Sequence, residues 1–235
     1  MTLQEVMTAL ESYGNEQTKK IFMKHGAKEP FFGVKVGDMK VLQKKIKKDQ
    51  ELAEQLYDTG NGDAMYFAGL IADESKVTKK LLDKWVKNAS WYMISEYTVP
   101  WLAADSGLAF ECGMEWIESK EEKIASAGWS ALSSFVSVQD PDEKQMNSLS
   151  KLVDRVKKDI HKSDNRVRYT MNNFIIAAGS FIPELADKAQ NSADDIGKVD
   201  VEMGGTACKV PDARTYIQKV IDKGRLGKKR KMARC

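Results

Sequence analysis

The chain has 235 residues, of which 42% are hydrophobic, 30% charged and 9% aromatic, and its formal net charge is +3. This length supplies one large domain or two small ones with a sizeable core. The longest apolar runs, near residues 65–72 and 174–183, fall well short of the roughly 20 residues that span a bilayer, and the N-terminus lacks the features of a secretory signal. We therefore expect neither a membrane protein nor a secreted protein.

The cysteines and histidines predict no metal site. There are three cysteines (Cys112, Cys208 and Cys235) and two histidines (His25 and His161), with no C-x-x-C spacing. An odd number of cysteines cannot form a closed disulfide framework, and this set is a poor zinc site. We expect a cytoplasmic protein without a metal or another cofactor.

Apolar residues recur at helical spacing from the first third of the chain onward. The clearest stripes run over residues 39–46, 124–135, 146–160 and 167–178. Helix starts are predicted by capping boxes and by a cap acceptor before a proline; these are Thr2 with Glu5, Ser119 with Glu122, and Asp140 before Pro141.

The pattern changes near residue 196. Residues 196–201 alternate like a short extended segment, and a last helix is predicted from about Pro211 to Gly224. No strong strand signal precedes residue 195. About twelve helices, with evenly spaced starts near Ser75, Ser90, Ser106 and Ser119, predict an all-α fold, an α-solenoid of HEAT-like antiparallel helix pairs. We expect a repeat domain over residues 1–195, an extension with the last helix over 196–223, and a basic tail over 224–235.

Charge is distributed unevenly along the chain. The last thirteen residues, 223–235, contain seven basic residues and no acidic one. Subtracting these seven from the 37 basic residues leaves 30 against 34 acidic residues, so the body is mildly acidic. A tail that seeks polyanions and a tail that is simply solvated are both consistent with this pattern.

Four segments, in this order and spacing, carry a family resemblance. They are Phe-Phe-Gly-Val-Lys at 31–35, Leu-Tyr-Asp at 56–58, Ser-Trp-Tyr-Met-Ile-Ser-Glu at 90–96 and Trp-Ile-Glu-Ser at 116–119. Over residues 20–180 the chain resembles the DNA alkylation repair family, the AlkD-like alkylpurine DNA glycosylases built from HEAT-like repeats, as a divergent member.

The resemblance implies a concave basic groove that holds double-stranded DNA. It also implies hydrolysis of the N-glycosidic bond of N3- or N7-alkylated purines. A carboxylate near the sugar would stabilise its developing positive charge and position water, and aromatic faces would contact the cationic base. The expected partner is double-stranded DNA, alkylated if the chain is a glycosylase; a monomer is compatible with the sequence, which does not determine the oligomeric state.

Carried over residue by residue, the resemblance is mixed. The catalytic carboxylate, normally Asp, falls on Glu96, and the aromatic one turn earlier falls on Tyr92, with Trp91 beside it. The groove arginine falls on Ser126, and the second pocket tryptophan falls near Asn173. Tyr92 and Glu96 are i, i+4 neighbours and share one helix face.

Basic residues elsewhere are candidates for contacts with DNA. Arg166 or Arg168 could replace the missing groove arginine from a neighbouring repeat. Two further groups of basic residues are candidates for DNA contacts, and each also fits a solvated surface. They are Lys44 and Lys45 on a predicted helix, and Lys228, Lys229 and Arg230 in the tail.

Three functions remain open at this stage. The first is an alkylpurine DNA glycosylase in which Glu96 acts on the sugar and Tyr92 packs on the lesion. The second is a non-catalytic HEAT-like module that binds DNA through the same face and the tail. The third is a protein-interaction scaffold without affinity for DNA.

Overall fold

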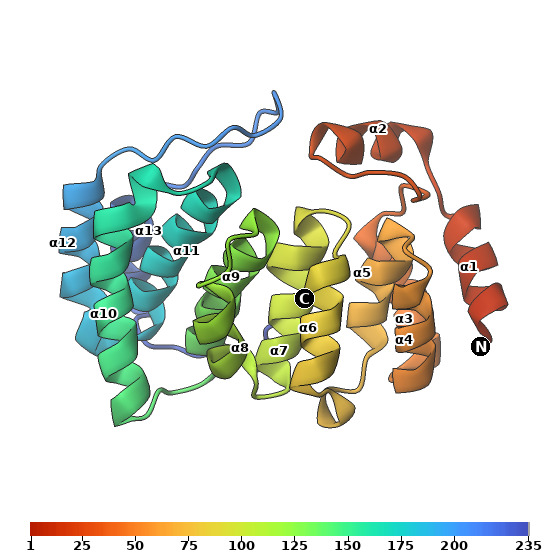
Figure 1. Cartoon of the computed structure of the whole chain (residues 1–235), viewed down its shortest axis with the longest axis horizontal. Helices are drawn as coiled ribbons and strands as arrows, with labels where there is room; N and C mark the ends of the chain where they lie inside the picture. The colour runs from red at the N-terminus through yellow and green to blue at the C-terminus, as the bar shows by residue number, and fades with distance from the viewer. Residues whose placement is uncertain (235) are drawn as a thin grey trace.

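The computed structural model describes residues 1–234, and these form an all-helical protein in which no strand is present (Figure 1). The thirteen α-helices of the described residues are α1 (Leu3–Ser12), α2 (Glu16–Lys24), α3 (Val36–Ile46), α4 (Gln50–Asp58), α5 (Gly62–Ile71), α6 (Lys79–Asn88), α7 (Val99–Asp105), α8 (Ala109–Trp116), α9 (Glu122–Val138), α10 (Glu143–Asp159), α11 (Asn165–Phe181), α12 (Ala186–Ile196) and α13 (Ala213–Asp222). The short turns between them are η1 (Glu74–Lys76), η2 (Ile94–Thr98), η3 (Ile160–Lys162) and η4 (Pro183–Leu185).

The helices stack as antiparallel pairs in chain order, which confirms the predicted HEAT-like solenoid. Helix α4 packs on α5, α8 on α9, and α11 on both α12 and α13. Helices α7, α9 and α11 also contact one another in succession, so they form one continuous layer. Figure 1 shows this order from α1 at one end of the molecule to α12 at the other.

Helix caps decide where the elements begin. The predicted capping box of Thr2 with Glu5 is present at α1. The predicted capping box of Ser119 with Glu122 was wrong, because α9 starts at Glu122 with no side-chain cap. Glu122 instead accepts a hydrogen bond from the backbone N–H of Arg166 at 2.7 Å. The cap of α10 is Asp142 rather than Asp140, and it forms a capping box with Gln145.

One helix and one helix crossing show how the core is packed. All ten residues of α5 are buried, because its sequence has no polar stripe to face water. At the α8–α9 crossing, glycines at 113 and 128 allow the backbones to approach closely. A Cβ on Gly128 would lie 2.6 Å from the Ile117 nitrogen and 3.0 Å from the Gly113 oxygen.

Residues 197–211 form the connection between α12 and α13, and no regular element occurs in them. The predicted short extended segment at 196–201 therefore pairs with no strand. The Asn165 side chain donates to the Glu202 carbonyl at 2.9 Å and accepts from its N–H at 2.7 Å. Beyond it, Gly204 packs against the Lys24 carbonyl of α2, and Figure 1 shows this loop reaching towards α2.

The basic tail is not a free, solvated segment, which corrects one of the two readings of its charge. After α13 the chain turns back, and residues 227–234 pack along the body; we call these eight residues the C-terminal strap. Arg234 is buried and forms ion pairs with Asp105 and Glu74. The described part of the chain accordingly ends against the middle helices, at α5 and α7.

Candidate functional site

The candidate carboxylate lies in a widened helical turn that the sequence explains. Pro100 has no N–H to donate, and in a regular helix its ring would clash with the carbonyl of Glu96, four residues earlier. The chain instead forms the π-helical turn η2, closed by a hydrogen bond from the Val99 N–H to the Ile94 carbonyl. Such π turns inside helices occur frequently at functional sites.

Glu96 forms a buried ion pair with Arg166 of α11. Only 3% of Glu96 is exposed. The guanidinium Nε of Arg166 donates to Oε1 at 2.8 Å, and its Nη2 donates to Oε2, so both carboxylate oxygens are engaged in a bidentate contact. The pair connects residues 70 positions apart in the sequence.

Two tyrosines enclose the guanidinium. Its carbon lies 4.3 Å from the ring centroid of Tyr92 and 4.5 Å from that of Tyr169, distances at which a cation is attracted to an aromatic face. Burial raises the pKa of Tyr92 to about 12, so its hydroxyl stays neutral at physiological pH. Burial also acts to lower the pKa of Arg166, but the hydrogen bond and charge of Glu96 outweigh this effect and raise it.

Burial acts in the opposite direction on Glu96. Desolvation raises the pKa of this carboxyl, while the hydrogen bond and charge of Arg166, and a weaker contribution from Ser126, lower it. Because two guanidinium N–H groups point at the two oxygens, the ionised form is the one whose charge is compensated. The site therefore holds a paired carboxylate rather than a free one.

Tyr92 and Trp91 face an apolar pocket of about 210 Å³ at the N-terminal end of the site. Its wall is formed by residues of α2, α3 and α5, by Val34 of the loop before α3, and by residues 91–93 just before η2. The Trp91 ring packs on Phe22 with centroids 5.3 Å apart. Asp63 fixes the adjoining loop, since its carboxylate accepts N–H groups of Phe32, Gly33 and Val34 at 2.6, 2.8 and 3.1 Å.

On its other side Glu96 lines a second pocket, which we call the serine pocket, of about 170 Å³. Four serines of α9 form much of its wall, at i, i+3, i+4 and i+7 spacing along one helix face. The complete lining is Glu96, Tyr97, Trp101, Ser130, Ser133, Ser134, Ser137, Asn173, Phe181 and Arg230. Helices α7, α9 and α11, η2 and the C-terminal strap all contribute to it.

Several predicted site residues therefore come together. Tyr92, Glu96 and Arg166 are in direct contact, and Asn173 and Arg230 share the serine pocket with Glu96. Ser126 is completely buried on α9, where its hydroxyl donates to the Lys123 carbonyl at 3.1 Å. Their roles in chemistry or DNA binding remain predictions.

Other predicted residues lie elsewhere. Arg168 is on α11 but contributes to the surroundings of Asp200, whose pKa is lowered mainly by Lys198 and more weakly by Arg168. Lys44 and Lys45 are exposed in the last turn of α3, and Lys228 is exposed in the strap. Lys229 donates to the carbonyls of Val136 and Phe181, both at 2.9 Å.

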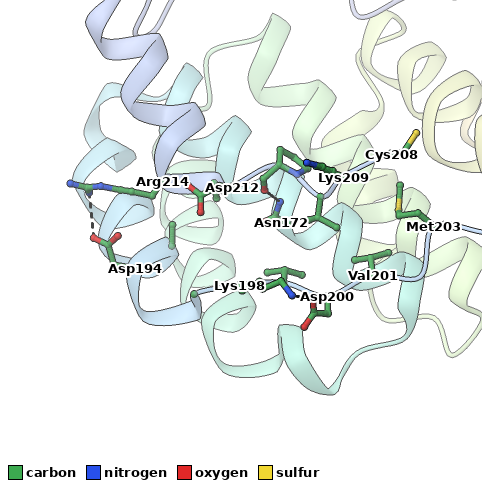
Figure 2. Close-up of a pocket in the computed structure, with 16 residues that line it drawn as sticks. Asn172, Asp194, Lys198, Asp200, Val201, Met203, Cys208, Lys209, Asp212 and Arg214 are labelled. Atoms are coloured by element: carbon green, nitrogen blue, oxygen red, sulfur yellow. Dashed lines mark hydrogen bonds and ion pairs between the residues drawn. The ribbon is translucent and has the colours of Figure 1, made fainter. Parts of the chain in front are cut away.

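A larger cavity, of about 500 Å³, lies between the 197–211 loop and helices α12 and α13 (Figure 2). Its charges are balanced: Lys198 pairs with Asp200 at 2.6 Å, and Arg214 pairs with Asp194 at 3.6 Å. The Asn172 amide donates to the Pro211 carbonyl at 2.9 Å. This balance favours neither an anionic nor a cationic ligand. Among the described residues, no cluster of His, Cys, Asp and Glu could hold a metal ion.

Sequence reasoning found part of the site and missed part of it. Helical spacing places Tyr169, three residues after Arg166 on α11, on the same polar face as Arg166, but its contact with the guanidinium was not predicted. Glu122, assigned to the cap of its own helix, instead contacts the first turn of α11. The charge of the tail made it a candidate for contacts with DNA, but its path along the body could not be predicted, because its contacts join residues more than 40 positions apart in the chain.

Comparisons with known proteins identify the family and support the fold. A family model described as DNA alkylation repair enzyme matches residues 6–195. Uncharacterised proteins of Listeria innocua and Listeria monocytogenes are each 32% identical over 225 residues, 93% of this chain and 97% of theirs. A solved structure from a new family of proteins related to the HEAT-like repeat DNA glycosylases, with affinity for branched DNA structures, is 41% identical. It superposes with a TM-score of 0.90 over 100% of both chains. No helix within the described residues is long and apolar enough to span a membrane.

Proposed function

Because the chain belongs to the DNA alkylation repair enzyme family, we propose that it binds DNA, with a preference for branched DNA, and does not excise bases. The binding face comprises Tyr92, the Glu96–Arg166 pair and the serine pocket. The observation that carries the proposal is the bidentate, buried pairing of Glu96.

Base excision requires a carboxylate that can act on the sugar. Such a group stabilises an oxocarbenium-like transition state by its unpaired negative charge and by positioning water. Here both oxygens of Glu96 accept N–H groups from Arg166, and the guanidinium neutralises the charge. Approach of a sugar would require this pair to separate, leaving two buried charges without partners, which is costly.

Affinity for branched DNA is supported by the likeness to a protein for which that affinity is stated, at 41% identity over the whole chain. The face also offers half-buried aromatic side chains, Tyr97 and Trp101, at the serine pocket. Bases at a branch point are less completely stacked than bases in a duplex, and aromatic rings provide stacking surfaces worth about 1–3 kcal/mol per base.

The test measures binding and excision with the same protein. Affinity is determined for a four-way junction and for a duplex of equal length at two salt concentrations. Release of 7-methylguanine and 3-methyladenine is measured on methylated duplex DNA. We expect tighter binding to the junction, weakening with salt, and no base release. Release that is lost in Glu96→Gln would contradict the proposal and establish the glycosylase. Absence of all DNA binding would instead favour a protein-interaction scaffold.

A further inference from the structure

We propose that the C-terminal strap completes the DNA-binding face by placing Arg230 in the serine pocket as a contact for a backbone phosphate, and that Arg234 is the positioning residue that holds the strap there. This inference rests on the proposed function. The family resemblance places a groove arginine at the position of Ser126, and a serine cannot hold a phosphate as an arginine does. The inference assigns this phosphate contact to the strap.

The strap follows the carboxyl-terminal ends of four alternate helices of the solenoid, α11, α9, α7 and α5. The Gly227 N–H donates to the Ser180 carbonyl of α11 at 3.0 Å, and the Arg230 N–H donates to the Ser137 carbonyl of α9 at 2.8 Å. The Ala233 N–H donates to Asp105 at the end of α7 at 2.6 Å. Arg234 then reaches α5. Carbonyls at helix ends lack partners within the helix and carry partial negative charge, so a basic segment is well suited to this path.

Arg234 is the anchor. Only 7% of it is exposed. Its Nε donates to Asp105 at 2.7 Å, its Nη2 to Glu74 at 2.6 Å, and its Nη1 to the carbonyls of Gly69 and Ala72 at 3.2 and 2.9 Å. These contacts use all three guanidinium nitrogens and four of the five N–H donors, so the buried Arg234 is committed to the body of the protein.

Arg230 has the opposite character. Its backbone is fixed by Ser137, but its guanidinium forms one hydrogen bond, from Nη2 to the Ala233 carbonyl at 3.1 Å. It has no ion pair with any carboxylate of the described residues. The residue is exposed and lines the serine pocket.

The charges of the pocket point to an anionic ligand. Its lining contains two charged residues, Glu96 and Arg230. Since Arg166 neutralises Glu96, no carboxylate of the pocket is left to pair with Arg230. The Asn173 amide and the hydroxyls of Ser130 and Ser134 add neutral donors nearby, whereas the hydroxyls of Ser133 and Ser137 donate to carbonyls within α9. A guanidinium with hydroxyl and amide groups around it matches a phosphate oxygen cluster, and in a DNA-binding face that phosphate belongs to the backbone.

The test compares Arg230→Ala with Arg225→Ala in the full chain. Arg225 carries the same charge five residues earlier, is exposed, and lines no pocket described here. We expect Arg230→Ala to weaken junction binding about tenfold at moderate salt and to reduce the slope of log affinity against log salt by about one phosphate contact. Arg225→Ala should change the slope by less than half as much.

Arg234→Ala tests positioning. It should weaken junction binding although Arg230 is intact, and combining it with Arg230→Ala should add little further loss. Circular dichroism and thermal melts confirm that each variant is folded. If the wild type binds the junction and Arg230→Ala binds it with the same affinity and the same salt slope, the inference is overturned while the proposed function stays intact. A wild-type protein that binds no DNA would refute the proposed function itself.

Discussion

At the scale of single residues, the Glu96–Arg166 pair determines what the site can do. It joins the η2 turn to α11, and the two tyrosines beside it shield the guanidinium from water. A buried pair is weak evidence for stability as such, because the desolvation of two charges offsets their attraction. Removing one partner is different, since the other charge then stays buried alone.

Arg166→Ala therefore should destabilise the fold by about 3–5 kcal/mol, the range for breaking a buried pair from one side. The double variant Arg166→Met with Glu96→Leu should recover most of that loss, because no buried charge remains. Urea denaturation measures both. Lys84→Ala is the control: it breaks an ion pair with Asp58 of 2.7 Å in which both side chains are about half exposed, and such pairs contribute about 0–1 kcal/mol. Equal losses in Arg166→Ala and Lys84→Ala would show that the buried pair has no special weight.

The sequence contained part of this site. Helical spacing was sufficient to place Tyr92 and Glu96 on one face, and the family resemblance directed attention to Ser126 and Asn173. The pairing of Glu96 with Arg166 could not be obtained in this way, because it depends on how α11 packs against η2. Arg166 and Arg168 were equivalent candidates in the sequence; two positions along a helix place them on different faces, and packing selects Arg166.

At the scale of elements, close backbone approach sets the α8–α9 crossing. Gly128→Ala would put a methyl group 2.6 Å from the Ile117 nitrogen and 2.8 Å from its Cγ2. Since backbone atoms cannot rotate away, the helices must separate, and we expect a loss of about 1–3 kcal/mol, as for overpacked cores. Thermal or urea melts measure it.

Gly37→Ala provides the matched control within α3. A Cβ there meets no atom within 4 Å, so the gain in helix propensity should stabilise the protein by about 0.5–1 kcal/mol. If Gly128→Ala were stabilising as well, the crossing would not be limited by contact at Gly128.

Element prediction succeeded where periodicity was strong and failed at boundaries. The stripes over 124–135, 146–160 and 167–178 correspond to α9, α10 and α11. The starts of α9 and α10 were misplaced by about two residues, because Ser119 and Asp140 are also good turn residues and only packing decides which polar residue caps. The tail was ambiguous, since its charge fits a segment that seeks polyanions and a solvated segment equally well, and its contacts with helix carboxyl ends are distant in the sequence.

At the scale of the whole molecule, the strap is the last described segment of the chain, and it binds α11, α9, α7 and α5 along the solenoid. In a solenoid each repeat contacts the next, so curvature is set by the sum of small rotations between them. A segment bound to α5, α7, α9 and α11 together restrains those rotations.

Glu74 makes this restraint dependent on pH. Burial acts to raise the pKa of Glu74, but hydrogen bonds from Lys48 and Arg234 help to outweigh it and lower the pKa to about 2. A carboxyl whose pKa is lowered on folding stabilises the protein fully above its ordinary value of 4.5, and this contribution is lost as the pH falls towards 2. Glu74→Gln should therefore lower the Tm at pH 7, and the difference from wild type should shrink between pH 4.5 and 2. Glu184→Gln, at an exposed residue, is the control and should leave the Tm unchanged across this pH range. If the Tm difference between Glu74→Gln and wild type stayed constant with pH, Glu74 would not be the group that makes the restraint depend on pH.

Ending the chain at Leu226 tests the restraint directly. Without the strap, the last carbonyls of α5, α9 and α11 lose the N–H, lysine and arginine donors that now bind them. The ends of these helices should open more often, because local opening depends on how many contacts hold a segment. We expect faster amide hydrogen exchange in the final turns of α5, α7, α9 and α11, while α1 and α4, which the strap does not touch, serve as internal controls. Faster exchange throughout the molecule would mean global destabilisation, and unchanged exchange would mean that neighbouring repeats fix the curvature without the strap.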